Sequence, residues 1–176
     1  THDKFGLNFS PLSMAAGGTK SMLASSLSFN VEYMDLRLYD KLFPDKYDWV
    51  KPFRKISGEV QYKVNPTSSC NIKTYIGFDR TDLSYNIPFS DFDTNERKLV
   101  MKDNNFYINS VCRLNLSRGW SFFSGIAGSW VRNVVNGAII ANDEMVDRKA
   151  ETHIKARISK NFAGRYRLSL GAEDYI

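Results

Sequence analysis

The sequence has no long hydrophobic run and few of the residue types that carry enzyme chemistry. No apolar stretch approaches the roughly 18 to 20 residues that a transmembrane helix needs, which excludes a helical membrane protein. The two histidines are His2 and His153. A histidine-based triad would have to use His153, which stands between Glu151 and Lys155 in an alternating segment. We therefore expect His153 to face solvent or a lumen.

Cysteine is also scarce. The two cysteines, Cys70 and Cys112, form neither a metal motif nor a disulfide framework, and both fall on the apolar register of their segments. If these segments pair around the connection 80–104, the thiols lie near each other, but a cross-strand bridge needs particular geometry. We expect two inert buried thiols.

Motifs for metal binding and acid–base chemistry are missing as well. The spacing of Asp91, Asp93 and Asn95 is like the start of an EF-hand calcium loop. However, Glu96 stands at the sixth position, where the loop has glycine, and Lys102 at the twelfth, where it has a bidentate glutamate. An EF-hand is excluded, whereas an irregular calcium site in this loop stays open. Carboxylates paired near the long loops are typical of loop solvation rather than catalysis. We expect a protein that is not an enzyme and needs no cofactor.

The net charge of +5 does not point to nucleic acid. It arises from 24 Lys and Arg residues interleaved with 19 acidic residues, without a basic stripe or a stacking motif. We expect no nucleic-acid partner.

The mean hydropathy of −0.37 does not exclude a membrane barrel, because only every second residue of a barrel strand faces lipid.

What the sequence does have is strict alternation of apolar and polar residues. In the segment 56–79, Val60, Tyr62 and Val64 fall on one face, and Ile72, Ile76 and Phe78 continue it after the turn at 65–69. The intervening residues are hydrophilic. This predicts a central antiparallel hairpin with one apolar and one polar face.

The same alternation recurs along the chain and predicts six to seven strands. A register switch at Met34 suggests a bulge or a change of environment after the strand that begins at Ser25. Short turns are predicted near residues 17, 67, 118 and 163, and long polar connections at 39–54, 80–102 and 133–147. All short turns then lie at one end of the strands and all long loops at the other, as in transmembrane barrels.

Aromatic residues form two tiers on the apolar face. The tier at the short-turn end and the tier toward the long loops bracket an aliphatic band, as expected for two membrane interfaces: Tyr62, Trp120 and Tyr166 in the first, and Tyr33, Phe78, Phe106 and Trp130 in the second. We therefore expect an all-β antiparallel meander of long hairpins that is part of a transmembrane β-barrel. The alternative is a soluble β-sandwich or small closed barrel that binds carbohydrate or protein.

Several segments resemble barrel strands of bacterial TonB-dependent outer-membrane receptors. They are residues 8–13, 38–46, 48–52 and 75–85, and the resemblance extends in a general way over the whole chain. The TonB box and the plug domain of the family are not in this sequence. The resemblance implies that residues 1–176 are one segment of a barrel domain, without the plug or the remaining strands.

The resemblance also implies a function for the parent protein. Members of the family import a nutrient such as a glycan, a peptide or a metal chelate across the bacterial outer membrane. The implied partners are outer-membrane lipid, the nutrient ligand, the TonB energy-transducing complex acting through the plug, and a surface lipoprotein. No functional residue of the family maps onto a motif of this chain.

Candidate ligand-binding residues are polar or aromatic side chains where the strands enter the long loops. Aromatic rings flanked by charges suit the recognition of sugars or peptides. The alternative is that these residues order the loops and mark the membrane interface. The candidates are Trp49, Asp79, Arg80, Asp82, Tyr85 and Arg132.

Overall fold

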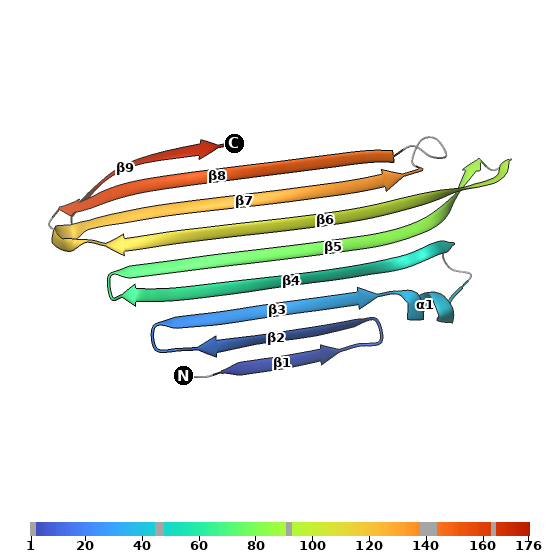
Figure 1. Ribbon diagram of the computed structural model, residues 1–176, viewed down its shortest axis with the longest axis horizontal. Helices are drawn as coiled ribbons and strands as arrows, with labels where there is room; N and C mark the ends of the chain where they lie inside the picture. Colours follow the sequence, from blue (N-terminus) through green and yellow to red (C-terminus); the bar gives the residue numbers. More distant parts are fainter. Residues whose placement is uncertain (1–2, 45–47, 91–92, 138–143, 163–164) are drawn as a thin grey trace.

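The alternating segments form antiparallel strands that follow one another in chain order. The computed structural model describes residues 3–44, 48–90, 93–137, 144–162 and 165–176. In these residues nine strands form one sheet with the order β1 to β9, each bonded to the next (Figure 1). The strands are β1 (Lys4–Phe9), β2 (Ser13–Ser21), β3 (Ser25–Asp35), β4 (Trp49–Thr67), β5 (Cys70–Ser90), β6 (Asp93–Asn115), β7 (Trp120–Asn136), β8 (Glu144–Phe162) and β9 (Tyr166–Tyr175).

The central hairpin is confirmed, because β4 and β5 pair through most of their length. Val60 lies opposite Ile76, and Val64 lies opposite Ile72. Residues that face each other across antiparallel strands share one face of the sheet. The apolar face therefore runs without interruption from β4 into β5, and Ile108 of β6 continues it opposite Ile76.

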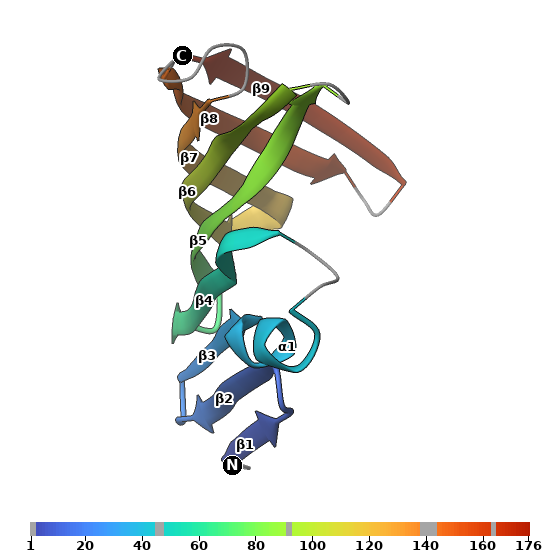
Figure 2. The ribbon, with the colours of Figure 1, turned by 90° about the vertical axis from the view of Figure 1, so that its right-hand side faces the viewer.

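No second layer of structure covers this sheet in the part of the chain that is described. The hydrophobic residues that are buried there are Leu99 and Val134. By contrast, Val60 is 39% exposed and Ile154 is 44% exposed, although both lie in the middle of long strands. A second view shows the strands as one curved layer, with helix α1 (Arg37–Leu42) beside β3 and β4 (Figure 2). The two-sheet sandwich considered above is therefore wrong for these residues.

The expected number of strands is also wrong. A turn was expected near residue 17, but Gly17 and Gly18 lie inside β2, where they pair with both β1 and β3. The turn lies at residues 22–24 instead. The small residues of β2 hide the alternation because they carry little hydrophobic contrast. With β1 and β2 as separate strands, the sheet has nine strands in the described residues rather than six to seven.

The long connections are shorter than expected because the strands continue into them. β4 starts at Trp49 and includes Pro52, and its pairing with β5 shifts register on both sides of Lys51. Such irregularity accommodates a proline that has no N–H to donate. β5 and β6 extend through most of 80–102 as a paired arm, and β7 and β8 likewise shorten the third connection.

Of the two explanations for the register switch at Met34, the bulge is wrong. β3 and β4 stay in continuous register from Ser25 to Asp35, so Tyr33 faces Ile56 and Met34 lies on the polar face.

The thiols of Cys70 and Cys112 are free and half-buried on the apolar face of neighbouring strands.

The asymmetry between the two ends of the sheet is confirmed in its main outline. The turns at 22–24, 68–69 and 117–119 lie at one end, and β8 and β9 meet there through the pair Phe162 and Tyr166 (Figure 1). Residues 163–164, on which the fourth predicted turn falls, lie outside the described residues. The opposite end carries α1 and the extended β5–β6 arm, but also the short turn at 10–12. Among the described helices, none has the length and hydrophobicity to cross a membrane.

The turn between β6 and β7 predicts a specific sensitivity. Gly119 has a φ of +78°, and a Cβ there would lie 2.8 Å from the carbonyl oxygen of Asn161. Gly119→Ala should therefore destabilise the protein by about 1–2 kcal/mol, measured by denaturant unfolding. Gly128→Ala in β7 is the control, because its Cβ would meet Ile108 at an ordinary 3.5 Å. Equal unfolding midpoints for the two variants would contradict this account of the turn.

Candidate functional site

The six candidate residues divide between the two faces of the sheet. Asp79 and Tyr85 lie on the polar face of β5, and Trp49 joins them because it is the register partner of Tyr85. Arg80 and Asp82 occupy the alternate positions of β5 and so lie on the apolar-face side. Arg132 lies on that same side, since it faces Asn104, which in turn faces Arg80. The candidates therefore do not form one site.

A groove of about 530 Å³ runs along the polar face across β3 to β7. Asp79 lines it and accepts a hydrogen bond of 2.9 Å from the side-chain amide of Asn105. The Tyr75 hydroxyl donates to Glu59 at 3.0 Å, and the rings of Tyr75 and Tyr107 have centroids 5.8 Å apart. The groove thus offers the rings of Tyr75 and Tyr107, three carboxylates from Glu32, Glu59 and Asp79, and amide groups, a mixture suited to polar organic ligands.

Trp49 and Tyr85 form an aromatic pair at the loop end of the polar face. Their ring centroids are 6.2 Å apart with an interplanar angle of 78°, an edge-to-face arrangement. Such pairs fix the relative position of two strands. Here the contact holds the start of β4 against β5 where their register is irregular.

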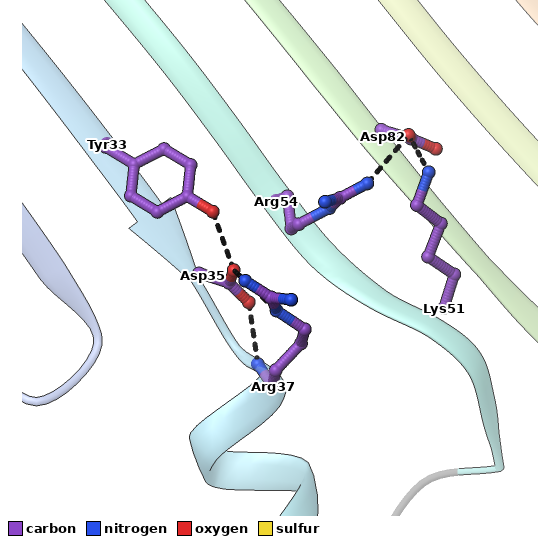
Figure 3. Close-up of polar contacts among 6 residues, drawn as sticks. All are labelled: Tyr33, Asp35, Arg37, Lys51, Arg54 and Asp82. Atoms are coloured by element: carbon purple, nitrogen blue, oxygen red, sulfur yellow. Dashed lines mark hydrogen bonds and ion pairs between the residues drawn. The ribbon is translucent and has the colours of Figure 1, made fainter.

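Asp82 is the centre of an ion-pair cluster on the opposite side of the sheet (Figure 3). Its carboxylate accepts a hydrogen bond from the Lys51 Nζ and lies 3.5 Å from the Arg54 guanidinium. Burial opposes ionisation of Asp82, but the Lys51 hydrogen bond and the nearby cations outweigh it and lower the pKa of this carboxyl. Asp82 is only 8% exposed, so it acts as an anchor for the start of β4.

Asp35 makes a second cluster next to the first, between β3 and α1 (Figure 3). Its carboxylate accepts hydrogen bonds from the Tyr33 hydroxyl at 2.7 Å, the Arg37 Nε at 2.8 Å and the Arg37 backbone N–H at 2.9 Å. Burial works against the charge, but the bonds from Arg37 and Tyr33 lower the pKa of Asp35 to about 2. This cluster fixes the first residues of α1 to the end of β3.

The polar face near the short turns carries positive charge. Arg113 and Arg157 lie on either side of the Phe123 ring, at 5.8 and 5.7 Å from its centroid. His153 lies on this face too, stacked on Tyr175 with centroids 4.1 Å apart. Its Nε2 is 2.7 Å from Glu173. In the described residues no three metal-ligating side chains come together.

The structure adds residues that the sequence did not single out. Glu59, Tyr75, Asn105 and Tyr107 line the groove beside Asp79. Alternation within β5 could have identified Tyr75, because residues at even separations from Asp79 in the same strand share its face. Partners on β4 and β6 depend on strand register, which the alternation of a single strand does not reveal. The calcium-like motif of Asp91, Asp93 and Asn95 involves residues outside the described set or with undescribed side chains.

Comparisons with known proteins place the fold. No family model matches the chain, and no curated protein matches its sequence. Among solved structures, the chain is similar to a mutant of the ferric enterobactin receptor (PfeA) from Pseudomonas aeruginosa. The TM-score is 0.58 at 12% sequence identity, over 93% of this chain and 28% of the receptor. The chain therefore has the fold of a section of that receptor and spans about 28% of its length.

The Asp35 cluster predicts a measurable titration. Arg37→Gln removes the side-chain hydrogen bond and the positive charge, so the pKa of Asp35 should rise from about 2 towards 3.8. Because the folded-state pKa is the lower one, the cluster stabilises the fold above pH 3.8, and this contribution is lost as the pH falls towards 2. Carbon-13 NMR of the Asp35 carboxylate measures the shift. Arg165→Gln, at the other end of the sheet, should leave it unchanged; an unchanged pKa in Arg37→Gln would refute the assignment.

Proposed function

We propose that this chain is a wall section of an outer-membrane β-barrel that imports a nutrient in the manner of TonB-dependent receptors. The observation that carries the proposal is the sheet itself: one face is apolar and uncovered, while the other is polar and grooved. The sequence resemblance to barrel segments of that family and the fold shared with a ferric enterobactin receptor support it.

The apolar face is suited to lipid rather than to water. Its aliphatic side chains lie in long strands, and Phe29, Val60 and Ile154 are 38%, 39% and 44% exposed. A soluble protein rarely leaves a continuous apolar surface of this size uncovered. Lipid covers such a face in a transmembrane barrel, where apolar and polar residues alternate between lipid and lumen.

The edges of the sheet fit a section that continues into further strands. β1 and β9 do not pair with each other in the described sheet, and each has one open edge. Leu170 in β9 is 76% exposed and Phe5 in β1 is 67% exposed. Open edges of this kind pair with neighbouring strands in a closed barrel. A small barrel closed by these nine strands alone finds no support.

In this proposal the polar face lines the lumen, and its groove lies along the route of the nutrient. The nutrient is a glycan, a peptide or a metal chelate, and its recognition uses the aromatic and charged groups of the groove. The TonB complex, acting through a plug domain, supplies the energy, and a surface lipoprotein assists capture. The chain performs no catalysis.

The assignment of faces predicts opposite effects of the same side chain at neighbouring positions. Val60→Arg or Ile76→Arg should destabilise the barrel by about 2–4 kcal/mol, since each places a charge near the middle of the lipid-facing band. Gln61→Arg introduces the same residue on the polar face and should be mild, as should Lys63→Arg. Yields of heat-modifiable barrel in outer-membrane fractions measure assembly. Equal yields for the four variants would rule out lipid contact at Val60 and Ile76.

Import is tested separately with the intact protein in its host. Deleting it should abolish or slow growth on one class among ferric chelates, glycans and peptides supplied as sole source. Growth should return with the wild-type protein but not when the proton-motive force that drives TonB is dissipated. A deletion strain that grows normally on every class would count against a role in nutrient import.

A further inference from the structure

Three arginines occupy one register row on the apolar-face side of the sheet, which we call the arginine row: Arg80, Arg132 and Arg148. Arg80 lies opposite Asn104, Asn104 opposite Arg132, and Arg132 opposite Arg148. Strands in a sheet are about 5 Å apart, so the whole row extends about 15 Å across β5 to β8. Each arginine comes from a different strand, and pairing of the strands brings them together.

The positive charges of the arginine row are not balanced by ion pairs within the described residues. Arg132 and Arg148 lie directly opposite each other on one face, and like charges in such positions repel. Within the described residues, the ion pairs and hydrogen bonds include none with the side chains of Arg80, Arg132 or Arg148. The Nε of Arg132 is buried and has no hydrogen-bond partner there. An anion between the guanidinium groups would remove both the repulsion and the unpaired donor.

Neighbouring acidic residues do not fill this role. Asp82, on the same face of β5, pairs through its Oδ2 with Lys51 and Arg54, and although its Oδ1 has no hydrogen-bond partner in the described residues, none of the three arginines forms an ion pair with it. Asp147 lies on the opposite face of β8 because it is next to Arg148 in the strand. Glu144 shares the face but lies two register rows farther toward the end of the strand. The anion must therefore come from outside the described sheet.

The row has a defined position relative to the apolar band. Phe78 and Trp130 each lie two residues from an arginine on the same strand and face, and Phe106 lies between them in register. These three rings are 45%, 43% and 42% exposed, in that order. Exposed aromatic rings mark the membrane interface, and long cationic side chains just beyond them reach the lipid headgroups.

We propose that the arginine row binds the phosphate groups of a phosphorylated glycolipid in the outer leaflet of the membrane. The inference rests on the proposed lipid contact of the apolar face. Guanidinium groups bind phosphate oxygens through paired, charge-assisted hydrogen bonds, and Arg132 with Arg148 can bracket one phosphate. Arg80, two strands away, reaches a second phosphate of the same headgroup. Barrel strands tilt by about 35–45°, so the row follows the rim obliquely.

The test titrates diphosphoryl lipid A into the intact barrel in nonionic detergent and follows binding by native mass spectrometry. The variant R80Q/R132Q/R148Q should bind at least about tenfold more weakly than wild type, because it loses several charge-assisted bonds. The variant with three lysines in place of these arginines should recover part of the affinity, since it restores charge without the planar fork. Dephosphorylated lipid A should bind wild type and R80Q/R132Q/R148Q equally.

The control variant K63Q/K73Q/K149Q removes the same charge from the polar face and should bind diphosphoryl lipid A as wild type does. Equal binding by R80Q/R132Q/R148Q and wild type would overturn the proposal, as would displacement of lipid A by inorganic phosphate at equal concentration. Heat-modifiable migration of each protein is measured first. A wild-type protein that forms no barrel refutes the proposed function itself, whereas a folded barrel with unchanged lipid binding refutes only the arginine row.

Discussion

The continuous antiparallel ladder determines every other feature of this sheet. Because β3 to β8 stay in register over most of their length, one residue on β4 decides which residues of its neighbours share its face. Val60 is thereby joined to Ile76 and Ile108, and Glu59 falls on the other side. A slip of one residue would exchange the two faces. The hydrophobic contrast between the faces and the backbone hydrogen bonds therefore support the same arrangement.

Alternation in the sequence predicts the central hairpin and the two faces, because a strand with one apolar face has a hydrophobic residue at every second position. It failed where that contrast is weak. In β2 the side chains are mostly small, Ala15, Ala16, Gly17 and Gly18 among them, so the pattern predicts a turn where the structure has a strand. In the β5–β6 arm, polar residues follow one another on both faces, so the extended pairing resembled a loop. Pro52 lies in a strand because the register is irregular there.

The candidate site was less predictable than the fold for a related reason. Asp79 and Arg80 are neighbours in sequence, yet they lie on opposite faces of the sheet. Asp79 lines the groove of the polar face, and Arg80 belongs to the arginine row. Arg132 and Arg148 are far closer in space than in sequence, and only the register of β7 with β8 brings them together. The pairing of Asp82 with Lys51 likewise depends on an irregular stretch of β4. Side-chain type indicated where polar groups gather, but register decided which of them meet.

The central claim is that one face meets lipid and the other meets an aqueous lumen. Nitroxide labels placed one at a time at residues 59–64, in the intact protein with Cys70 and Cys112 changed to serine, test it in lipid bilayers. The account predicts that collisions with oxygen, which concentrates in lipid, peak at 60, 62 and 64. Collisions with a water-soluble nickel chelate should peak at 59, 61 and 63. Accessibility to both reagents without a period of two, or with the two sets exchanged, would contradict the account.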